Sequence, residues 1–296
     1  MLVEYYSREV GTEGQILALR AWPETRTDGA KVKFSRQQVT TGEDSLVVVD
    51  THVHVGLRNY VSVEELLGRM DEIGIGKAVL VQYRAGLPPP GNTDNSYIST
   101  CVKRYPSRLV AVCIVDHRRE DALETLEYWV TEHGVQGIRL DGTDTSPREK
   151  LAVWKKSDEL GMNVSVSGNI SPLAGIARKL PNLNLLVEHA GMPKTNGDII
   201  LRLAEYDNVL VKFTTGGLHS ISSEPYPYRD AQPFFRRIHE VFGPDRIMWG
   251  SDYPPVEGRE GYARSLDFIK KEVGWLSDND REWILGRTAM KIWRFR

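Results

Sequence analysis

Eight short apolar runs, rich in β-branched residues, recur from residue 46 onward and constrain the fold more than any other feature. They occupy residues 46–55, 77–83, 109–115, 135–142, 162–168, 184–189, 209–215 and 246–252. Near-continuous runs of Val, Ile and Leu are typical of parallel strands buried on both faces. Amphipathic segments that predict helices separate them, for example at residues 62–74, 120–134, 148–161 and 197–207. This alternation predicts an α/β fold, a (β/α)8 TIM barrel.

A doubly wound open sheet is the alternative fold for alternating strands and helices. Such a sheet gathers its functional residues at one switch point, whereas polar residues recur here at the ends of most strands. We therefore expect a single barrel domain over residues 46–296. Residues 1–45 are mixed, polar and weakly periodic, which predicts an N-terminal extension.

The charge balance and the cysteines limit which classes of protein are plausible. The 38 basic and 40 acidic residues give a net charge of −2, so nothing favours binding to nucleic acid or an anionic membrane. No apolar run is long enough to span a membrane, and the first residues contain no signal-peptide core. Cys101 and Cys113 lack metal-site spacing, which favours two buried, reduced thiols. We expect a cytoplasmic homo-oligomer that acts on a small molecule.

The stretch VVVDTHVHVG contains three ionisable residues at alternate positions, Asp50, His52 and His54. Side chains alternate between the two faces of a strand, so these three are predicted to share one face. Burying them together is costly unless a partner compensates. The pattern indicates a metal site, a proton-transfer site, or both.

Further ionisable residues end other predicted strands, and in a barrel these ends meet at one mouth, where catalytic groups lie. The fourth strand ends in Arg139 and Asp141. The later strands add the residues Glu188, His189, Lys212 and Asp252.

The motifs VDTHVH, EHAGMP and GPDRIMWGSDYP resemble those of the amidohydrolase superfamily. They are most similar to its amidohydrolase-2 branch of barrel hydrolases, lactonases and decarboxylases, over residues 46–296. The resemblance implies that His52 and His54 bind a divalent metal or polarise the substrate directly, with His189 at the sixth strand. It also implies that Asp252 orients and deprotonates the attacking water.

The fifth predicted strand departs from that pattern. Metal-binding members of the family often carry a histidine at its end, whereas this chain has Ser165, Ser167 and Asn169. Serine is a poor zinc ligand. We therefore expect a divalent metal, zinc first, held by His52, His54 and Asp252 to be weakly bound or dispensable.

Two cations at strand ends have two interpretations. Arg139 and Lys212 could form ion pairs with Asp141 or Asp50, or could hold a carboxylate of the substrate. Arg84 and Asn169 are further substrate-binding candidates of the same kind.

We expect hydrolysis of a small lactone, carboxylated or polyhydroxylated, by water that Asp252 activates. A lactone carbonyl needs an electrophile for its oxyanion and a base for water, and the histidines and Asp252 supply them. The first alternative is a metal-dependent decarboxylase of an aromatic or unsaturated acid. The absence of a histidine at the end of the fifth predicted strand disfavours it. The second is an inactive barrel that serves as a binding module, against which the retained Asp252 argues.

Overall fold

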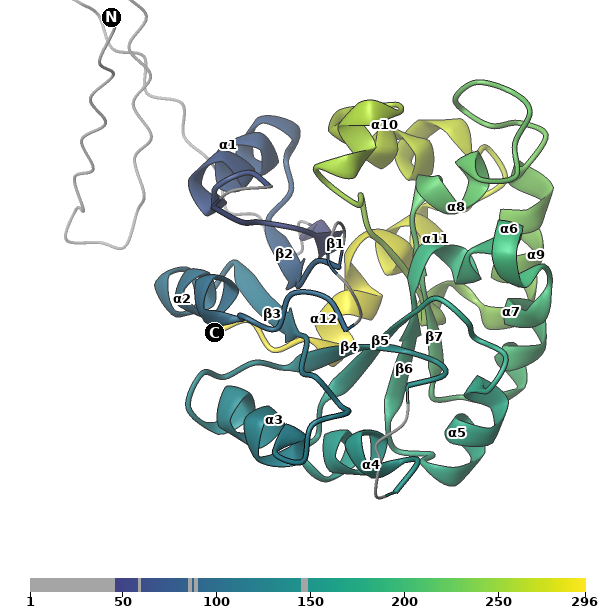
Figure 1. Cartoon of the computed structure of the whole chain (residues 1–296). Helices are drawn as coiled ribbons and strands as arrows, with labels where there is room; N and C mark the ends of the chain where they lie inside the picture. Colours follow the sequence, from purple (N-terminus) through teal and green to yellow (C-terminus); the bar gives the residue numbers. More distant parts are fainter. Residues whose placement is uncertain (1–45, 58–59, 85–86, 88–89, 145–148) are drawn as a thin grey trace, which may run out of the picture. The chain divides into compact units, whose positions relative to one another are not determined.

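The computed structural model describes residues 46–57, 60–84, 87, 90–144 and 149–296, and its centre is one sheet of eight parallel strands (Figure 1). Each strand pairs with the next along the chain, so the spatial order is the sequence order. The strands are β1 (Val49–Val53), β2 (Lys77–Val81), β3 (Leu109–Cys113), β4 (Gly137–Asp141), β5 (Asn163–Ser167), β6 (Asn184–Val187), β7 (Val209–Phe213) and β8 (Ile247–Trp249). Each lies within one of the eight predicted runs.

Residues just beyond β8 pair with β1 and bring the two edges of the sheet together. The His54 amide donates to the Tyr253 carbonyl at 2.8 Å, and the Asp252 amide donates to the His52 carbonyl at 2.9 Å. The pairing of β1 with β2 shifts its register between Asp50 and Val53. The predicted (β/α)8 barrel is confirmed.

Helices surround the sheet and include those predicted from the sequence (Figure 1). Among the described residues these helices include α1 (Val63–Ile73), α2 (Ser96–Arg104), α3 (Ala122–Thr131), α4 (Ala152–Glu159), α5 (Leu173–Lys179), α8 (Thr215–His219), α9 (Gln232–Phe242) and α10 (Tyr262–Asp267). The segment predicted at 197–207 is divided into α7 (Ile199–Arg202) and the 3₁₀ helix η2 (Leu203–Glu205). Local signals set the ends of α1. The Ser62 side chain accepts from the Glu65 amide, and Gly74, with φ 77°, ends the helix.

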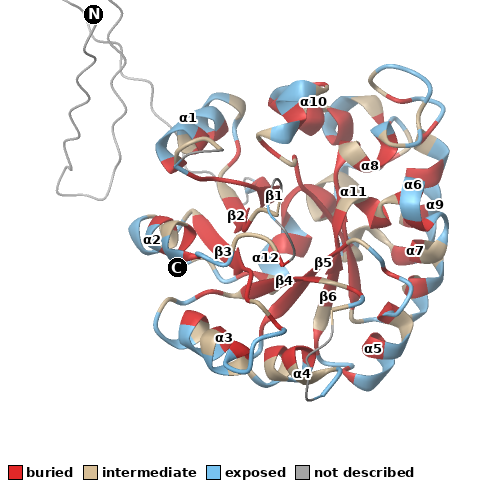
Figure 2. Ribbon diagram, in the orientation of Figure 1, coloured by how far each residue is buried: buried red, intermediate tan, exposed pale blue. Residues whose placement is uncertain are grey.

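Apolar side chains fill the barrel at the end opposite its mouth. One buried cluster joins residues of β1, β2, β3, β6, β7 and β8 to Trp293, near the end of the chain. The Trp293 ring lies against Gly137 at the start of β4, so it packs at the end where the strands begin. A second, larger cluster packs the helices onto the strands, and Figure 2 shows the strands buried and the outer faces of the helices exposed. This packing leaves the carboxyl ends of the strands for polar groups.

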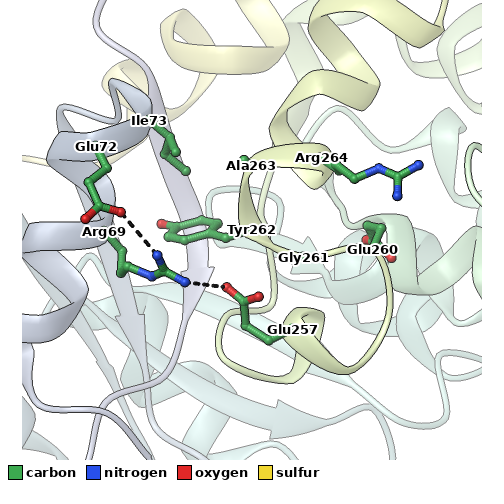
Figure 3. Close-up of a pocket in the computed structure, with 9 residues that line it drawn as sticks. All are labelled: Arg69, Glu72, Ile73, Glu257, Glu260, Gly261, Tyr262, Ala263 and Arg264. Atoms are coloured by element: carbon green, nitrogen blue, oxygen red, sulfur yellow. Dashed lines mark hydrogen bonds and ion pairs between the residues drawn. The ribbon is translucent and has the colours of Figure 1, made fainter.

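A cavity of about 180 Å³ lies between α1 and the segment around Tyr262 (Figure 3). Arg69 contacts Glu72 on its own helix at 3.2 Å and Glu257 at 3.6 Å. It thereby joins α1 to the 3₁₀ helix η4 (Pro255–Gly258). None of the candidate site residues from the sequence lines this cavity, so we treat it as a packing feature.

Among the described residues, no helix is long and apolar enough to cross a membrane. The predicted N-terminal extension, residues 1–45, lies outside the described residues.

Candidate active site

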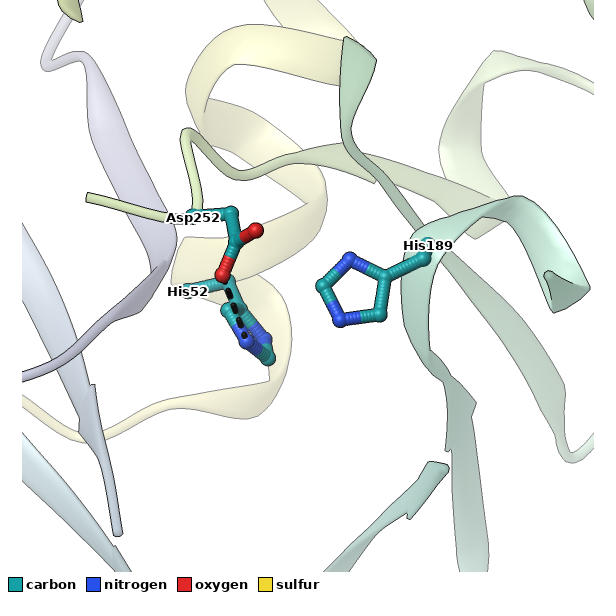
Figure 4. A group of neighbouring side chains, drawn as sticks. All are labelled: His52, His189 and Asp252. Atoms are coloured by element: carbon teal, nitrogen blue, oxygen red, sulfur yellow. Dashed lines mark ion pairs between the residues drawn. The ribbon is translucent and has the colours of Figure 1, made fainter. Parts of the chain in front are cut away.

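The predicted catalytic residues come together at the carboxyl ends of β1, β6 and β8 (Figure 4). His52 lies in β1, and His54 follows it. His189 lies in the 3₁₀ helix η1 (Glu188–Gly191), directly after β6. Asp252 follows β8 and faces His52, with His189 opposite. The sequence thus predicted which residues converge at the mouth.

The two carboxylate oxygens of Asp252 have different neighbours. Oδ1 lies 3.7 Å from His52 Nε2 and 3.5 Å from His54 Nε2, while Oδ2 lies 3.5 Å from Arg259 Nη1. Burial acts to raise the Asp252 pKa, but the contact with His54 and the charge of Arg259 lower it below its usual value. Asp252 is therefore a carboxylate at neutral pH. Its φ of 63° is the left-handed conformation, which is uncommon for a non-glycine residue and recurs at functional sites.

His52 is fully buried, and neither ring nitrogen has a hydrogen-bond partner among the described residues. Nδ1 lies 3.7 Å from Glu188 Oε1, and Nε2 lies 3.7 Å from Asp252 Oδ1. Burial, together with the charge of Lys212, holds the His52 pKa well below its usual value, so the ring is neutral. A neutral imidazole carries one proton and cannot satisfy both carboxylates. The site therefore favours a further proton donor or cation beside this ring.

The protonation of His54 follows from its surroundings. Nδ1 lies 2.7 Å from the Val81 carbonyl oxygen, which can only accept, so Nδ1 carries a proton. Nε2 faces Asp252 Oδ1 at 3.5 Å, and a proton held there would be shared with that carboxylate. This arrangement also favours a water proton or a cation between them.

His189 completes the cluster from the opposite side of the mouth. Its Nδ1 lies 2.9 Å from Thr214 Oγ1, and its ring centroid lies 4.8 Å from that of His52. Burial lowers the His189 pKa, although the charges of Asp252 and Glu188 oppose the shift. Its φ of 53° is again left-handed.

Three of these residues could hold a metal ion. One ligand atom from each of His52, His189 and Asp252 lies within 4.8 Å of the others. Two imidazoles and one carboxylate are a donor set found in catalytic zinc sites. The group contains His189 and lacks the predicted His54, although His54 Nε2 also lies 3.5 Å from Asp252 Oδ1.

Glu188, whose role the sequence left undecided, lies fully buried beneath the histidines. Arg139 donates to Glu188 Oε2 through Nε at 3.1 Å and through Nη2 at 2.7 Å. The Ser165 hydroxyl donates to Oε1 at 2.6 Å, and Lys212 Nζ lies 3.9 Å from the same oxygen. Burial acts to raise the Glu188 pKa, but the charges of Arg139 and Lys212 lower it well below its usual value. Glu188 is thus a carboxylate held between two cations.

The cations predicted to bind substrate already have protein partners. Arg139 pairs with Glu188 rather than with Asp141, and its Nη1 donates to the Gln82 carbonyl at 3.1 Å. Lys212 is fully buried and donates to Ser165 Oγ at 2.9 Å. Their contact with a substrate stays a prediction.

Arg84 and Asn169 lie apart from the histidine cluster. Arg84 Nη2 donates to the Arg139 carbonyl at 3.3 Å and lies 3.6 Å from Asp144 Oδ2. Asn169 is exposed, and its side-chain oxygen accepts from the Ser171 amide at 2.9 Å. Their roles in substrate binding also stay predictions.

Sequence reasoning did not single out Arg259, which contacts Asp252. It lies seven positions beyond Asp252 on a loop, without periodicity or a recognisable motif. Only the structure shows that its neighbour Glu260 is buried, with Oε2 3.6 Å from Arg259 Nε.

Comparison with curated proteins finds relatives named for lactones. The chain is 29% identical over 208 residues to 4-sulfomuconolactone hydrolase from Rhizobium radiobacter, covering 64% of this chain and 65% of that protein. It is 27% identical over 264 residues to D-galactarolactone isomerase from Agrobacterium fabrum, covering 78% of this chain and 85% of that protein.

Solved structures share the barrel. A candidate 2-pyrone-4,6-dicarboxylic acid hydrolase from Pseudomonas putida superposes with a TM-score of 0.67 at 22% identity, covering 84% of this chain and 97% of that chain. Structures at 18% identity or less include an amidohydrolase with bound zinc and two decarboxylases. Likeness at this level shows the fold alone. The amidohydrolase family model, however, matches residues 49–295, so the chain belongs to the amidohydrolase family.

Proposed function

We propose that this chain hydrolyses a small lactone that carries a carboxylate or hydroxyl groups, using a water molecule that Asp252 activates. The proposal rests on the Asp252 carboxylate at the barrel mouth, 3.5 Å from His54 Nε2 and 3.7 Å from His52 Nε2. The lactones in the names of both relatives support it.

In the proposed reaction, Asp252 carries the proton and two histidines stabilise the oxyanion. The water oxygen adds to the lactone carbonyl carbon while its proton passes to Asp252. His52 and His189, with lowered pKa values, are neutral imidazoles that can donate N–H to the developing oxyanion. The bond from the acyl carbon to the ring oxygen then breaks. The proton on Asp252 moves to that oxygen, and the product is an open hydroxy acid.

The two alternatives from the sequence have less support. Metal-dependent decarboxylation would use the same cluster, but Ser165 on β5 is engaged by Glu188 and Lys212 rather than free to act as a ligand. An inactive binding module would not need a base. Here Asp252 is retained and ionised, with three histidines around it.

A substrate panel in isotopically labelled water tests the function. The panel contains lactones with carboxylate, sulfonate, hydroxyl or no substituents, and one aromatic carboxylic acid. We expect ring opening with uptake of one labelled oxygen. An unlabelled rearranged lactone would instead indicate isomerisation, and release of carbon dioxide from the aromatic acid would favour the decarboxylase.

His52, His189 and Asp252 could together hold a divalent metal, and we propose zinc as the first candidate. The two unpartnered ring nitrogens of His52, both buried, support this fit. A bound divalent ion would polarise the carbonyl and lower the pKa of bound water. The residues themselves would still orient the water and hold its proton.

We expect chelation to lower activity only partly, whereas His52→Gln should lower it severely. Among the described residues the donor set has three members, and β5 supplies Ser165 where metal-binding members of the family often carry a histidine. The measurement is metal content per chain before and after a chelator titration, alongside turnover. One tightly held zinc per chain, with activity lost on removal and restored on return, would contradict this expectation.

The homo-oligomeric state and the cytoplasmic location stay predictions. Sedimentation of the purified chain tests the first.

A further inference from the structure

Most cations predicted at the mouth donate to the protein itself. Arg139 is used by Glu188 and the Gln82 carbonyl, and Lys212 donates to Ser165. Arg84 donates to the Arg139 carbonyl. An acidic group on a substrate would have to compete with these partners.

Arg259 is different because its guanidinium forms no hydrogen bond with any described residue. It has two charged contacts, Nη1 at 3.5 Å from Asp252 Oδ2 and Nε at 3.6 Å from Glu260 Oε2. Nε and Nη2 are buried without a hydrogen-bond partner. A buried donor left unsatisfied is destabilising, so acceptor oxygens placed beside this guanidinium would relieve that cost.

A cavity of about 440 Å³ adjoins this arginine. Its lining includes two arginines, Arg259 and Arg264, two glutamates, Glu224 and Glu260, and the hydroxyl-bearing side chains of Tyr226 and Tyr228. The guanidinium of Arg264 stacks on the Tyr226 ring, 4.3 Å from its centroid, and adds a second positive charge. Arg259 therefore connects this cavity to Asp252.

The two carboxylates that line the cavity leave the hydrogen-bond donors of Arg259 available. Glu260 accepts the hydroxyl hydrogens of Tyr228 and Thr215, one on each oxygen. Glu224 is exposed, so solvent screens its charge. Glu260 thus links the loop that carries Arg259 to α8, through its contact with Thr215.

We propose that this cavity receives an acidic substituent of the substrate, a carboxylate or sulfonate, and that Arg259 is the specificity-determining residue that binds it. The inference rests on the proposed lactone hydrolysis and adds the substrate class. A planar guanidinium suits two oxygens of such an anion. The reacting carbonyl would then lie beside Asp252, because Arg259 contacts both the cavity and that carboxylate.

The test compares a lactone that carries a free carboxylate with its neutral methyl ester. We expect Arg259→Met to lower kcat/KM for the acid about 10- to 100-fold, chiefly through KM, because it removes a charge-assisted contact. The ester should lose about tenfold less than the acid, because it loses only the contact of Arg259 with Asp252 and not the contact with the substrate anion. Arg259→Lys, which keeps the charge but not the planar fork, should restore part of the discrimination.

The matched control is Arg237→Gln, an exposed arginine on α9 that pairs with Asp198 at 2.8 Å. It should leave both substrates unaffected. Equal losses for acid and ester in Arg259→Met would overturn the proposal and assign Arg259 to positioning Asp252. Unchanged kinetics would overturn it as well.

Direct binding separates failure of this inference from failure of the proposed function. We expect calorimetry to detect glutarate binding to the wild-type chain and not to Arg259→Met, with unfolding temperatures matched. Binding that depends on Arg259 without turnover of any lactone would keep the subsite and reject the function. Lactone turnover without acid discrimination or glutarate binding would keep the function and reject the subsite.

Discussion

Asp252→Asn is expected to lower the rate of lactone opening by about 10²- to 10⁴-fold, the usual scale for a lost acid–base group. The amide has nearly the shape of the carboxylate but cannot accept the water proton. Asparagine also tolerates the left-handed conformation that Asp252 adopts, with φ 63°, whereas alanine would add backbone strain. The loss should therefore appear in kcat with the fold intact. Initial rates and thermal unfolding, measured on the same preparation, check both statements.

Asp207→Asn is the matched control, an exposed aspartate that precedes β7 at the opposite end of the barrel. It should leave turnover unchanged. Since burial is outweighed and the Asp252 pKa lies below its usual value, protonation of Asp252 should not reduce activity in mildly acidic buffer. An Asp252→Asn variant with near wild-type turnover would remove Asp252 from the mechanism.

The strands could be predicted because each is apolar enough to be buried on both faces. The same burial made the strand-end groups conspicuous. His52, His54 and Asp252 stand out because ionisable side chains are rare in such runs. His189 reaches them from η1, where the backbone after β6 turns through residues with positive φ.

The side-chain partners within the barrel could not be predicted. Asp50 was expected to lie with His52 and His54, but its Oδ1 accepts the backbone amides of His52 and Ser251 instead. The register shift between Asp50 and Val53 breaks the simple alternation on which that expectation relied. Strand period alone does not reveal a shift of register.

The pairing of Glu188 with Arg139 was missed for a related reason. The two residues lie 49 positions apart, Arg139 on β4 and Glu188 directly after β6, and these two strands are not neighbours in the sheet. A local pattern cannot indicate such a contact. The sequence offered Asp141 or Asp50 as ion-pair partners of Arg139, or a carboxylate of the substrate, and did not offer Glu188.

The second large effect is expected from Glu188→Gln, which should destabilise the fold by about 3–5 kcal/mol, the usual cost of breaking a buried ion pair. The variant keeps the side-chain shape but leaves Arg139 and Lys212 buried without a countercharge. Burial lowers the pKa of Lys212 to about 8 even with Glu188 present, so this lysine should lose its proton in the variant and limit the cost. The midpoint of urea unfolding measures the effect, provided that the slope is unchanged.

The pH dependence of this effect has a definite sign. The Glu188 pKa is lower in the folded chain than its ordinary value of 4.5, so the folded state binds fewer protons there. Its contribution to stability is complete above that ordinary value and is lost as the pH falls below it. The difference in stability between the wild type and Glu188→Gln should therefore shrink in acid.

Two further variants show whether the loss comes from the buried charges. Asp198→Asn breaks the exposed pair with Arg237 and should cost no more than about 1 kcal/mol. Lys212→Met combined with Glu188→Gln removes one stranded cation along with the carboxylate. The double variant should be less destabilised than the sum of its two single variants, because contacting charges are not additive. Simple additivity, or a Glu188→Gln loss as small as that of Asp198→Asn, would mean that Glu188 does not hold the buried cations together.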